Sequence, residues 1–302
     1  MPEKKIAITT TSFAKFDTKP IDLLKEKGYA IVTNTYKREI KGNEIIEICK
    51  GCIGIVAGTE KYEREILTEL KGLKVISRCG VGMDNVDIAT ANSLGMQVVN
   101  TPLGPTLAVA ELTVGLILGL LRKINRMDSD IRKGKWEKLM GNLLNKKKVG
   151  ILGFGRIGQK TAELLKVFGV DLAYFDIEDK NSLNAKKMEF DDILGWADII
   201  VLHLSASKGK VLIGIDEIAK LKKGSIFINV SRGGVAAEEP LLEALKNGQI
   251  AGAALDVFEK EPYAGPFIEL DNVILTPHIG SYAKEARIEM ETQAVINLLE
   301  KL

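Results

Sequence analysis

Residues 147–176 read KKVGILGFGRIGQKTAELLKVFGVDLAYFD. The short apolar run Val149–Leu152 predicts a buried strand, and a glycine-rich turn follows it at once. An apolar helical repeat then runs from Ile157 to Phe168, and a second strand ends at Asp176. Strand, glycine turn, helix, strand and acid in this order are typical of a dinucleotide-binding unit. The combination is much more specific than an isolated GxGxxG pattern.

Each of the three glycines in this turn has a distinct physical task. Gly153 permits the tight turn from strand to helix, and Gly158 permits close packing of the helix on the strand. Gly155 lets the backbone approach a pyrophosphate without a Cβ in the way. The phosphates would then lie at a helix N-terminus, where unpaired N–H groups and a partial positive charge favour an anion.

The acid at the end of the second strand indicates which dinucleotide is bound. Asp176 follows Gly158 at about the spacing of 20 residues expected for a carboxylate that binds the adenosine ribose. A 2′-phosphate would meet this acid as a like charge, and the next residues, Ile177 and Glu178, include no arginine. The sequence therefore predicts NAD. A glycine turn without a ligand is the competing interpretation, and it leaves the strand, helix and acid unexplained.

Length and composition are those of a globular protein with two domains. The chain has 302 residues, of which 46% are hydrophobic and 27% are charged, and its net charge is +2. This balance gives no reason to expect nucleic acid or an anionic membrane as a partner. The longest apolar run, Leu107–Leu121, contains Glu111 and Thr113 and is shorter than the ~20 residues of a bilayer span. We interpret it as a buried helix. The N-terminus MPEKKIAIT shows no signal peptide, so we expect a cytoplasmic protein.

The three cysteines suit a reducing compartment. Cys49 and Cys52 form a CxxC pattern, which can indicate redox chemistry or half of a metal site. No second cysteine pair exists, and the only histidines are His203 and His278. We therefore expect no metal and interpret the pair, like Cys79, as small residues in the core.

Strand-like and helix-like segments alternate along almost the whole chain, which predicts an α/β fold with two doubly wound parallel sheets. The first unit is expected to be flavodoxin-like and the second to be a Rossmann domain. We expect the substrate domain to comprise residues 1–99 and 280–302, and the NAD-binding domain residues 100–279. A single apolar helix, Thr106–Met127, is predicted between them. The last helix, Ala283–Lys301, is expected to pack on the first domain. Further strands are expected near Lys5–Thr9, Ala30–Thr33, Ile53–Ala57, Leu73–Ser77, Gln97–Val99, Asp171–Phe175, Ile199–Leu202, Ile226–Asn229, Ala251–Leu255 and Val273–Leu275.

Three segments of the second unit place polar residues after buried strands, where open α/β sheets bind their ligands. They are NVSRGGVAAEEPL with Arg232, GAALDVFEKEP with Asp256 and Glu261, and LTPHIGSY with His278. Oxidation of a 2-hydroxy acid needs an arginine to hold the carboxylate, a histidine to take the hydroxyl proton and an acid to orient that histidine. The sequence predicts such an enzyme. His203 also follows an apolar strand, but we interpret it as structural.

The chain resembles the D-isomer-specific 2-hydroxyacid dehydrogenases, and among them most closely the phosphoglycerate dehydrogenase branch. The resemblance covers nearly the full length. It rests on SRCGVGMDNVD, NTPLGPTLAVAEL, GILGFGRIGQ, INVSRGGV, AGAALDVFEKEP and TPHIGS, which occur in the order of the family.

The resemblance implies a role for each matching position. Arg232 would orient the substrate, Glu261 would support the histidine, and His278 would be the general acid and base. Asp256 would lie near the nicotinamide carboxamide, and Asp176 would bind the ribose. Residues implied to contact the cofactor are Gly153, Gly155, Arg156, Ile157, Gly158, Asp176, Val81, Leu204, Val230, Asp256, His278 and Gly280. Residues implied to contact the substrate are Arg78, Gly80, Val81, Gly82, Arg232 and His278.

The sequence departs from the family pattern in two loops. In HLSASKGKVLIG, Ser205 replaces a proline that relatives usually carry, so the adenine side of the cofactor pocket is expected to differ. Enzymes that act on 3-phosphoglycerate commonly carry an arginine after the third strand, whereas this chain reads IVAGTEKYERE, with Ala57, Gly58 and Thr59. Lys61, Arg64 or Arg78 could compensate. Since the sequence ends at Leu302, we expect no C-terminal regulatory domain and no inhibition by serine through one.

The leading hypothesis from the sequence is NAD-dependent oxidation of D-3-phosphoglycerate to 3-phosphohydroxypyruvate, with the substrate bound in a cleft between the two domains. A reductase of glyoxylate, hydroxypyruvate or another short 2-oxo acid is the alternative enzyme. A cofactor-sensing protein similar to transcriptional corepressors is the alternative of another class. The resemblance also implies a homodimer formed through the apolar helix and the following segment IRKGKWEKLMG.

Overall fold

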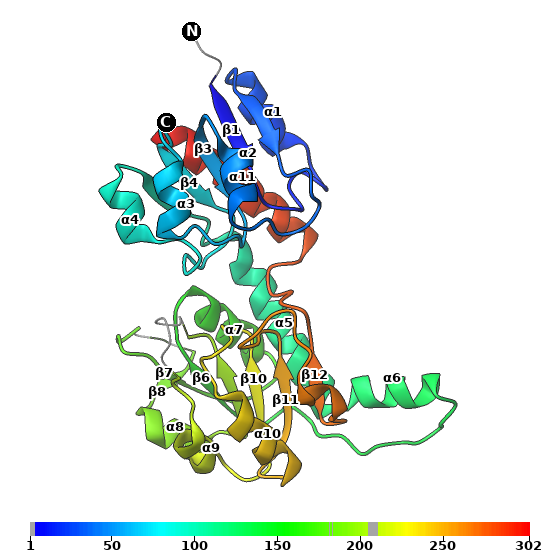
Figure 1. Ribbon diagram of the computed structural model, residues 1–302. Helices are drawn as coiled ribbons and strands as arrows, with labels where there is room; N and C mark the ends of the chain where they lie inside the picture. The colour runs from blue at the N-terminus through cyan, green and yellow to red at the C-terminus, as the bar shows by residue number, and fades with distance from the viewer. Residues whose placement is uncertain (1–3, 181, 183, 205–210) are drawn as a thin grey trace. The chain divides into compact units, whose positions relative to one another are not determined.

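The computed structural model describes residues 4–180, 182, 184–204 and 211–302. It divides into two compact units, which we call the first unit (Met1–Pro105 with Ser281–Leu302) and the second unit (Thr106–Gly280) (Figure 1). Each contains a parallel sheet with helices, which confirms the predicted α/β class. The boundaries predicted from the sequence, after residues 99 and 279, fall near these divisions.

The first unit is built on a five-stranded parallel sheet of order β2-β1-β3-β4-β5, the order of flavodoxin-like folds. Five of the six residues of its central strand β3 are buried, because helices cover both faces of the sheet. Its strands are β1 (Lys5–Ile8), β2 (Ala30–Thr33), β3 (Cys52–Ala57), β4 (Val75–Arg78) and β5 (Gln97–Asn100). Its helices are α1 (Lys19–Glu26), α2 (Asn43–Cys49), α3 (Arg64–Glu69), α4 (Ile88–Ser93) and α11 (Lys284–Lys301).

Helix α11 returns the end of the chain to the first unit. The hydroxyl of Ser77, on β4, donates to the carbonyl of Ala294 at 2.7 Å. A buried ion pair joins Arg287 and Glu291 at 2.8 Å on the same helix. The Glu291 carboxylate also accepts the backbone N–H of Ala14 at 2.8 Å. The helix therefore holds the segment after β1 as well as the sheet.

The second unit is built on a seven-stranded parallel sheet of order β12-β11-β10-β9-β6-β7-β8. All four residues of its middle strand β9 are buried. The strands are β6 (Lys148–Leu152), β7 (Asp171–Phe175), β8 (Lys186–Lys187), β9 (Ile199–Leu202), β10 (Ser225–Asn229), β11 (Ile250–Leu255) and β12 (Val273–Leu275). The other elements are α5 (Gly104–Leu121), α6 (Ile124–Arg132), α7 (Arg156–Lys166), α8 (Phe190–Trp196), α9 (Ile215–Lys220), α10 (Glu238–Lys246) and the 3₁₀ helix η1 (Pro266–Glu269).

The single helix predicted for Thr106–Met127 is wrong, because the chain forms α5 and α6 there. The break lies at Lys123, whose φ of 53° is left-handed and ends a right-handed helix. The N–H of Asn142 donates to the carbonyl of Leu121 at 2.8 Å, so a later segment caps the end of α5. The apolar pattern does not reveal this contact between residues that are distant in sequence.

Helix α5 is long and apolar enough to cross a membrane by length and composition, and 44% of it is buried within the structure. Val109, Leu116, Ile117 and Leu121 belong to the core of the second unit, where they pack with residues of β6 and β9. This packing is what the sequence predicts for a buried helix.

All three cysteines are buried and carry free thiols. Cys49 ends α2 and Cys52 begins β3, so the CxxC pattern lies at the helix-to-strand junction. Burial raises the pKa of the Cys49, Cys52 and Cys79 thiols, which keeps them protonated and unreactive. The geometry supports the structural interpretation of the pair.

Candidate active site and cofactor site

The glycine-rich turn lies between β6 and α7. Gly153 has a φ of 89°, a conformation that favours glycine. A Cβ on Gly153 would lie 2.5 Å from the backbone oxygen of His203, and one on Gly158 would lie 2.3 Å from the oxygen of Gly153. Real Cβ atoms do not approach backbone so closely, so the packing of the protein itself requires glycine at both positions.

Gly155 differs from these two glycines. A Cβ built on it would meet no described atom within 4 Å, and its φ of −70° suits any residue. Packing of the chain therefore does not explain the glycine, whereas close approach of a ligand to the backbone does. Arg156 and Ile157 follow as the first residues of α7, so an anion here would meet the N-terminus of an 11-residue helix.

Asp176 lies directly after β7, beside the glycine turn. Its carboxylate accepts the backbone N–H of Phe154 at 2.7 Å and that of Glu178 at 3.0 Å. These two bonds fix its orientation. A carboxylate has about four lone-pair sites, so this one can still accept hydrogen bonds from ribose hydroxyls. The turn and the acid thus fit the dinucleotide that the sequence predicts.

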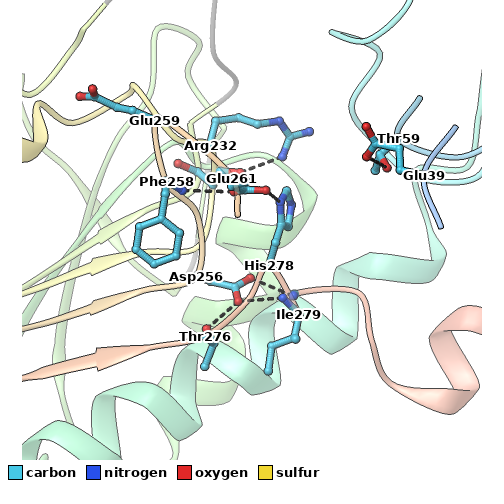
Figure 2. A network of polar contacts seen from close by, with 12 residues as sticks. Glu39, Thr59, Arg232, Asp256, Phe258, Glu259, Glu261, Thr276, His278 and Ile279 are labelled. Carbon is cyan, nitrogen blue, oxygen red and sulfur yellow. Dashed lines mark hydrogen bonds and ion pairs between the residues drawn. The ribbon is translucent and has the colours of Figure 1, made fainter. Parts of the chain in front are cut away.

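His278 and Glu261 form a hydrogen-bonded pair, Nδ1 to Oε2, at 2.9 Å (Figure 2). The Glu261 carboxylate also accepts the N–H of Phe258 at 3.2 Å. Burial alone would raise the pKa of Glu261, but its hydrogen bond to His278 and the charges of His278 and Arg232 together lower it. An ionised carboxylate can only accept, so Nδ1 of His278 donates and Nε2 is left to exchange a proton with a substrate.

Arg232 is presented by a turn that follows β10. Asn229 forms this turn, since its side-chain oxygen accepts the N–H and the hydroxyl of Ser231 at 3.0 and 2.8 Å. Its amide donates to the carbonyl of Arg232 at 3.1 Å. The charge of Arg232 is close enough to lower the pKa of Glu261. The second unit thus brings together all three residues predicted to be catalytic.

Asn229 and Ser231 were not singled out from the sequence, although they hold Arg232 in place. The sequence does contain an indication of this turn, because an asparagine two residues before a serine at a strand end is typical of an Asx turn.

Asp256 is 1% exposed and holds the loop that carries His278. Its carboxylate accepts the hydroxyl of Thr276 at 2.6 Å and the N–H groups of Ile279 and Gly280 at 2.8 and 2.9 Å (Figure 2). His278 itself adopts a left-handed φ of 53°. Asp256 therefore stabilises an unusual backbone at the histidine, a structural role that the sequence did not indicate. Its predicted position near the nicotinamide stays a prediction.

The remaining cofactor residues of the second unit lie at the same edge of the sheet. Leu204 and Val230 follow the ends of β9 and β10, where Leu204 is half-buried and Val230 is buried. Gly280 is buried against Val109, which a Cβ on it would approach to 3.2 Å. The departure at Ser205 lies outside the described residues.

The predicted substrate loop, residues 78–82, lies after β4 in the first unit. Gly80 and Thr101 exchange hydrogen bonds of 2.8 and 3.0 Å, and the amide of Asn100 donates to the carbonyl of Val81 at 2.7 Å. Gly80 has a φ of 151°, and Arg78 folds over it to donate to the carbonyl of Cys79. Gly82, half-buried, completes the loop. The loop is held in shape by its own bonds, and its predicted contact with substrate stays a prediction.

Residues 114–280 match the model of the D-isomer-specific 2-hydroxyacid dehydrogenase NAD-binding domain. The chain is 43% identical to a glyoxylate reductase of Thermofilum pendens over 81% of this chain and 76% of that one. It is 37% identical to a D-3-phosphoglycerate dehydrogenase of Archaeoglobus fulgidus over 89% of this chain and 53% of that one. The solved structure of the TT0316 protein of Thermus thermophilus matches with a TM-score of 0.90 at 31% identity, over 98% of this chain and 96% of that one.

The chain belongs to the D-isomer-specific 2-hydroxyacid dehydrogenase family.

Membership in this family identifies the cofactor as NAD, in agreement with the residues of the glycine turn and Asp176. The chain spans about half the length of the D-3-phosphoglycerate dehydrogenases that it matches, and 76% of the length of the glyoxylate reductase. The names of these relatives differ, so membership in the family leaves the substrate open.

His203 follows β9 but takes no part in the catalytic cluster. Its Nε2 lies 2.9 Å from the hydroxyl of Thr161, and burial lowers its pKa to about 3. The ring is therefore neutral at physiological pH, which agrees with its structural interpretation.

This buried histidine should make the protein less stable in acid. Between pH 6.5 and about 3 the unfolded chain binds a proton at His203 that the folded chain does not. The free energy of unfolding should therefore fall by up to ~1.4 kcal/mol per pH unit as the pH decreases. Urea unfolding at pH 5, 6 and 7 should show a smaller decrease for His203→Gln than for the wild type. If the free energy of unfolding falls equally with pH in the wild type and in His203→Gln, the folded His203 ring takes up the proton as the unfolded chain does.

Proposed function

We propose that this protein interconverts a D-2-hydroxy acid and the corresponding 2-oxo acid with NAD. The observation that carries the proposal is the hydrogen bond of 2.9 Å between His278 and Glu261, with Arg232 close by. In the oxidative direction Nε2 of His278 takes the hydroxyl proton, and the carboxylate of Glu261 stabilises the imidazolium that forms. Arg232 holds the substrate carboxylate. NAD, when bound, accepts the hydride.

Two substrates are candidates for this site. D-3-phosphoglycerate is the leading hypothesis from the sequence, and its oxidation would supply serine biosynthesis. Glyoxylate or hydroxypyruvate is favoured by a specific observation in the loop after β3, where Glu39 and Glu60 accept hydrogen bonds from the loop's own donors. Of the cations proposed to compensate, Lys61 and Arg64 are exposed, and Arg78 donates to the carbonyl of Cys79 and to the side-chain oxygen of Asn85.

Steady-state assays of the purified protein test the function and the substrate together. NAD reduction is measured with D-3-phosphoglycerate, and NADH oxidation with glyoxylate, hydroxypyruvate and other short 2-oxo acids. We expect turnover with at least one short 2-oxo acid. If none of these compounds is turned over while a protein partner is captured only in the presence of NADH, the corepressor-like alternative replaces the enzyme.

We also propose that the protein is a homodimer formed through the second unit. Helix α6 and the segment after it extend from this unit (Figure 1) and expose a large apolar surface. Its side chains are exposed by 56% at Ile124, 55% at Ile131, 82% at Trp136, 88% at Met140 and 72% at Leu143. Surfaces of this kind are covered in most soluble proteins.

Sedimentation velocity at micromolar concentration is expected to give the mass of a dimer. Trp136→Glu should shift the protein to a monomer, because it places a charge in the apolar surface. The control Val167→Glu, at a residue of the second unit that is 84% exposed, should leave the dimer intact. A wild-type monomer would contradict the proposed interface.

We also propose a cytoplasmic location, in keeping with the three free thiols of the protein.

A further inference from the structure

In the loop after β3, a side-chain carboxylate of the loop accepts a hydrogen bond from a backbone N–H of the same loop. The N–H of Gly58 donates to Oε2 of Glu60 at 2.7 Å, and the hydroxyl of Thr9 donates to the same oxygen at 3.1 Å. Glu60 is only 2% exposed, although it lies at the carboxyl edge of the sheet, where open α/β sheets bind their ligands. A backbone N–H at this edge could hold an anionic group of a ligand, but here Glu60 already occupies it.

The next residue of the loop also donates a hydrogen bond to a carboxylate. The hydroxyl of Thr59 donates to Oε2 of Glu39, which comes from the segment after β2, at 3.1 Å (Figure 2). Gly58 and Thr59 thus both direct a donor to an acid of the protein. Two donors that an arriving anion would need at this edge of the sheet are consequently already taken by carboxylates of the protein.

Neighbouring side chains hold this arrangement in place. The Thr9 hydroxyl lies 2.8 Å from the hydroxyl of buried Tyr62. The side-chain amide of Asn85 donates to the carbonyls of Gly58 and Glu60 at 3.1 and 2.7 Å. The loop is therefore bonded on both its side-chain and backbone groups, and releasing the Gly58 N–H for a ligand would break its buried hydrogen bond to Glu60.

We propose, on the basis of the function proposed above, that Glu60, assisted by Glu39, determines specificity by excluding substrates that carry a second anionic group. The substrate class is then the short 2-oxo and 2-hydroxy acids whose only charge is the carboxylate. Glu60 acts in two ways, since it occupies the donor that a phosphate would need and, when ionised, repels the phosphate as a like charge. Burial raises the pKa of the Glu60 carboxyl, so this repulsion strengthens as the pH rises.

Hydroxypyruvate and 3-phosphohydroxypyruvate test this directly, because they differ only by the phosphate. With NADH, the wild type should show a kcat/KM for hydroxypyruvate at least about a hundredfold above that for the phosphorylated compound, the size of discrimination that a repulsive element can supply. Glu60→Gln, which removes the charge at nearly constant shape, should narrow this ratio at least about tenfold. The change should lie mainly in KM for the phosphorylated substrate, with hydroxypyruvate little affected.

Two further variants separate specificity from folding. Glu39→Gln removes an exposed charge without disturbing the buried network and should narrow the ratio by a smaller factor, so the proposal is testable even if Glu60→Gln fails to fold. The control Glu69→Gln removes an exposed acid at the far end of α3 and should leave the ratio unchanged.

The outcomes are distinct. A wild type that prefers the phosphorylated compound would overturn the specificity proposal and leave the dehydrogenase assignment intact. If Glu60→Gln and Glu39→Gln each change kcat/KM for hydroxypyruvate and for the phosphorylated compound by the same factor, these acids have only a structural role. A wild type that reduces neither compound, nor glyoxylate, would overturn the proposed function together with this inference.

Discussion

Replacement of His278 by alanine should lower kcat by about 10²- to 10⁴-fold, the usual contribution of a positioned acid and base. The hydrogen bond of 2.9 Å to Glu261 keeps the proton on Nδ1, so Nε2 is the nitrogen that accepts the substrate proton. Without the ring no described group of the cluster can replace it, because Arg232 does not lose its proton and Glu261 lacks its partner. The measurement is kcat with the best 2-oxo acid and NADH between pH 6 and 8.

Three controls show whether the loss of kcat comes from the proton-transfer step. NADH binding, followed by fluorescence, should weaken far less than kcat falls in His278→Ala, because the glycine turn is untouched. Glu261→Gln should lose less activity than His278→Ala, since the histidine remains but its charged form is less stabilised. His203→Gln, at the other histidine, should keep nearly normal turnover at pH 7. Turnover of His278→Ala within about threefold of the wild type would refute the acid-base assignment.

Gly155→Ala should weaken cofactor binding, whereas Gly158→Ala should lower the stability of the fold. The new methyl group on Gly158 would meet the oxygen of Gly153 at 2.3 Å, so the helix and strand would have to separate. Overpacking of this kind costs about 1–3 kcal/mol or more. The methyl group on Gly155 would meet no described atom within 4 Å, and the free energy of unfolding should change by less than about 1 kcal/mol. It would, however, fill the space into which the pyrophosphate is expected to fit.

Urea unfolding and NADH titration separate these two effects. Gly155→Ala should weaken NADH binding by at least about tenfold, or 1.4 kcal/mol, while its unfolding midpoint stays close to that of the wild type. Gly158→Ala should unfold at lower urea. Unchanged NADH affinity in Gly155→Ala would remove the main structural reason to place the cofactor at this turn.

The sequence predicted much of this structure because each signal was local. The strand, glycine turn and acid of residues 147–176 lie within one supersecondary unit, so their spacing alone specifies their contacts. The polar cluster of the second unit was predicted for a related reason. Parallel strands bring their carboxyl ends to one edge, so Arg232, Glu261 and His278 were expected near each other once the strands were assigned.

Other features depend on contacts that the local sequence does not record. The break between α5 and α6 is capped by Asn142, about twenty residues after Leu121, and the apolar pattern continues across it. Asp256 was predicted to lie near the nicotinamide, but its contacts with Thr276, Ile279 and Gly280 show that it also fixes the histidine loop. In both cases the partner of a backbone group comes from a separate element.

The sequence by itself determined the fold class and the cofactor and predicted a cluster of arginine, acid and histidine, because periodicity, glycine spacing and strand ends are properties of short segments. The tertiary structure decided how the polar groups are paired. It shows that Gly58 and Thr59 donate to Glu60 and Glu39. Hydrogen-bond partners depend on which loops the sheet places side by side, and that arrangement exists only in the folded chain.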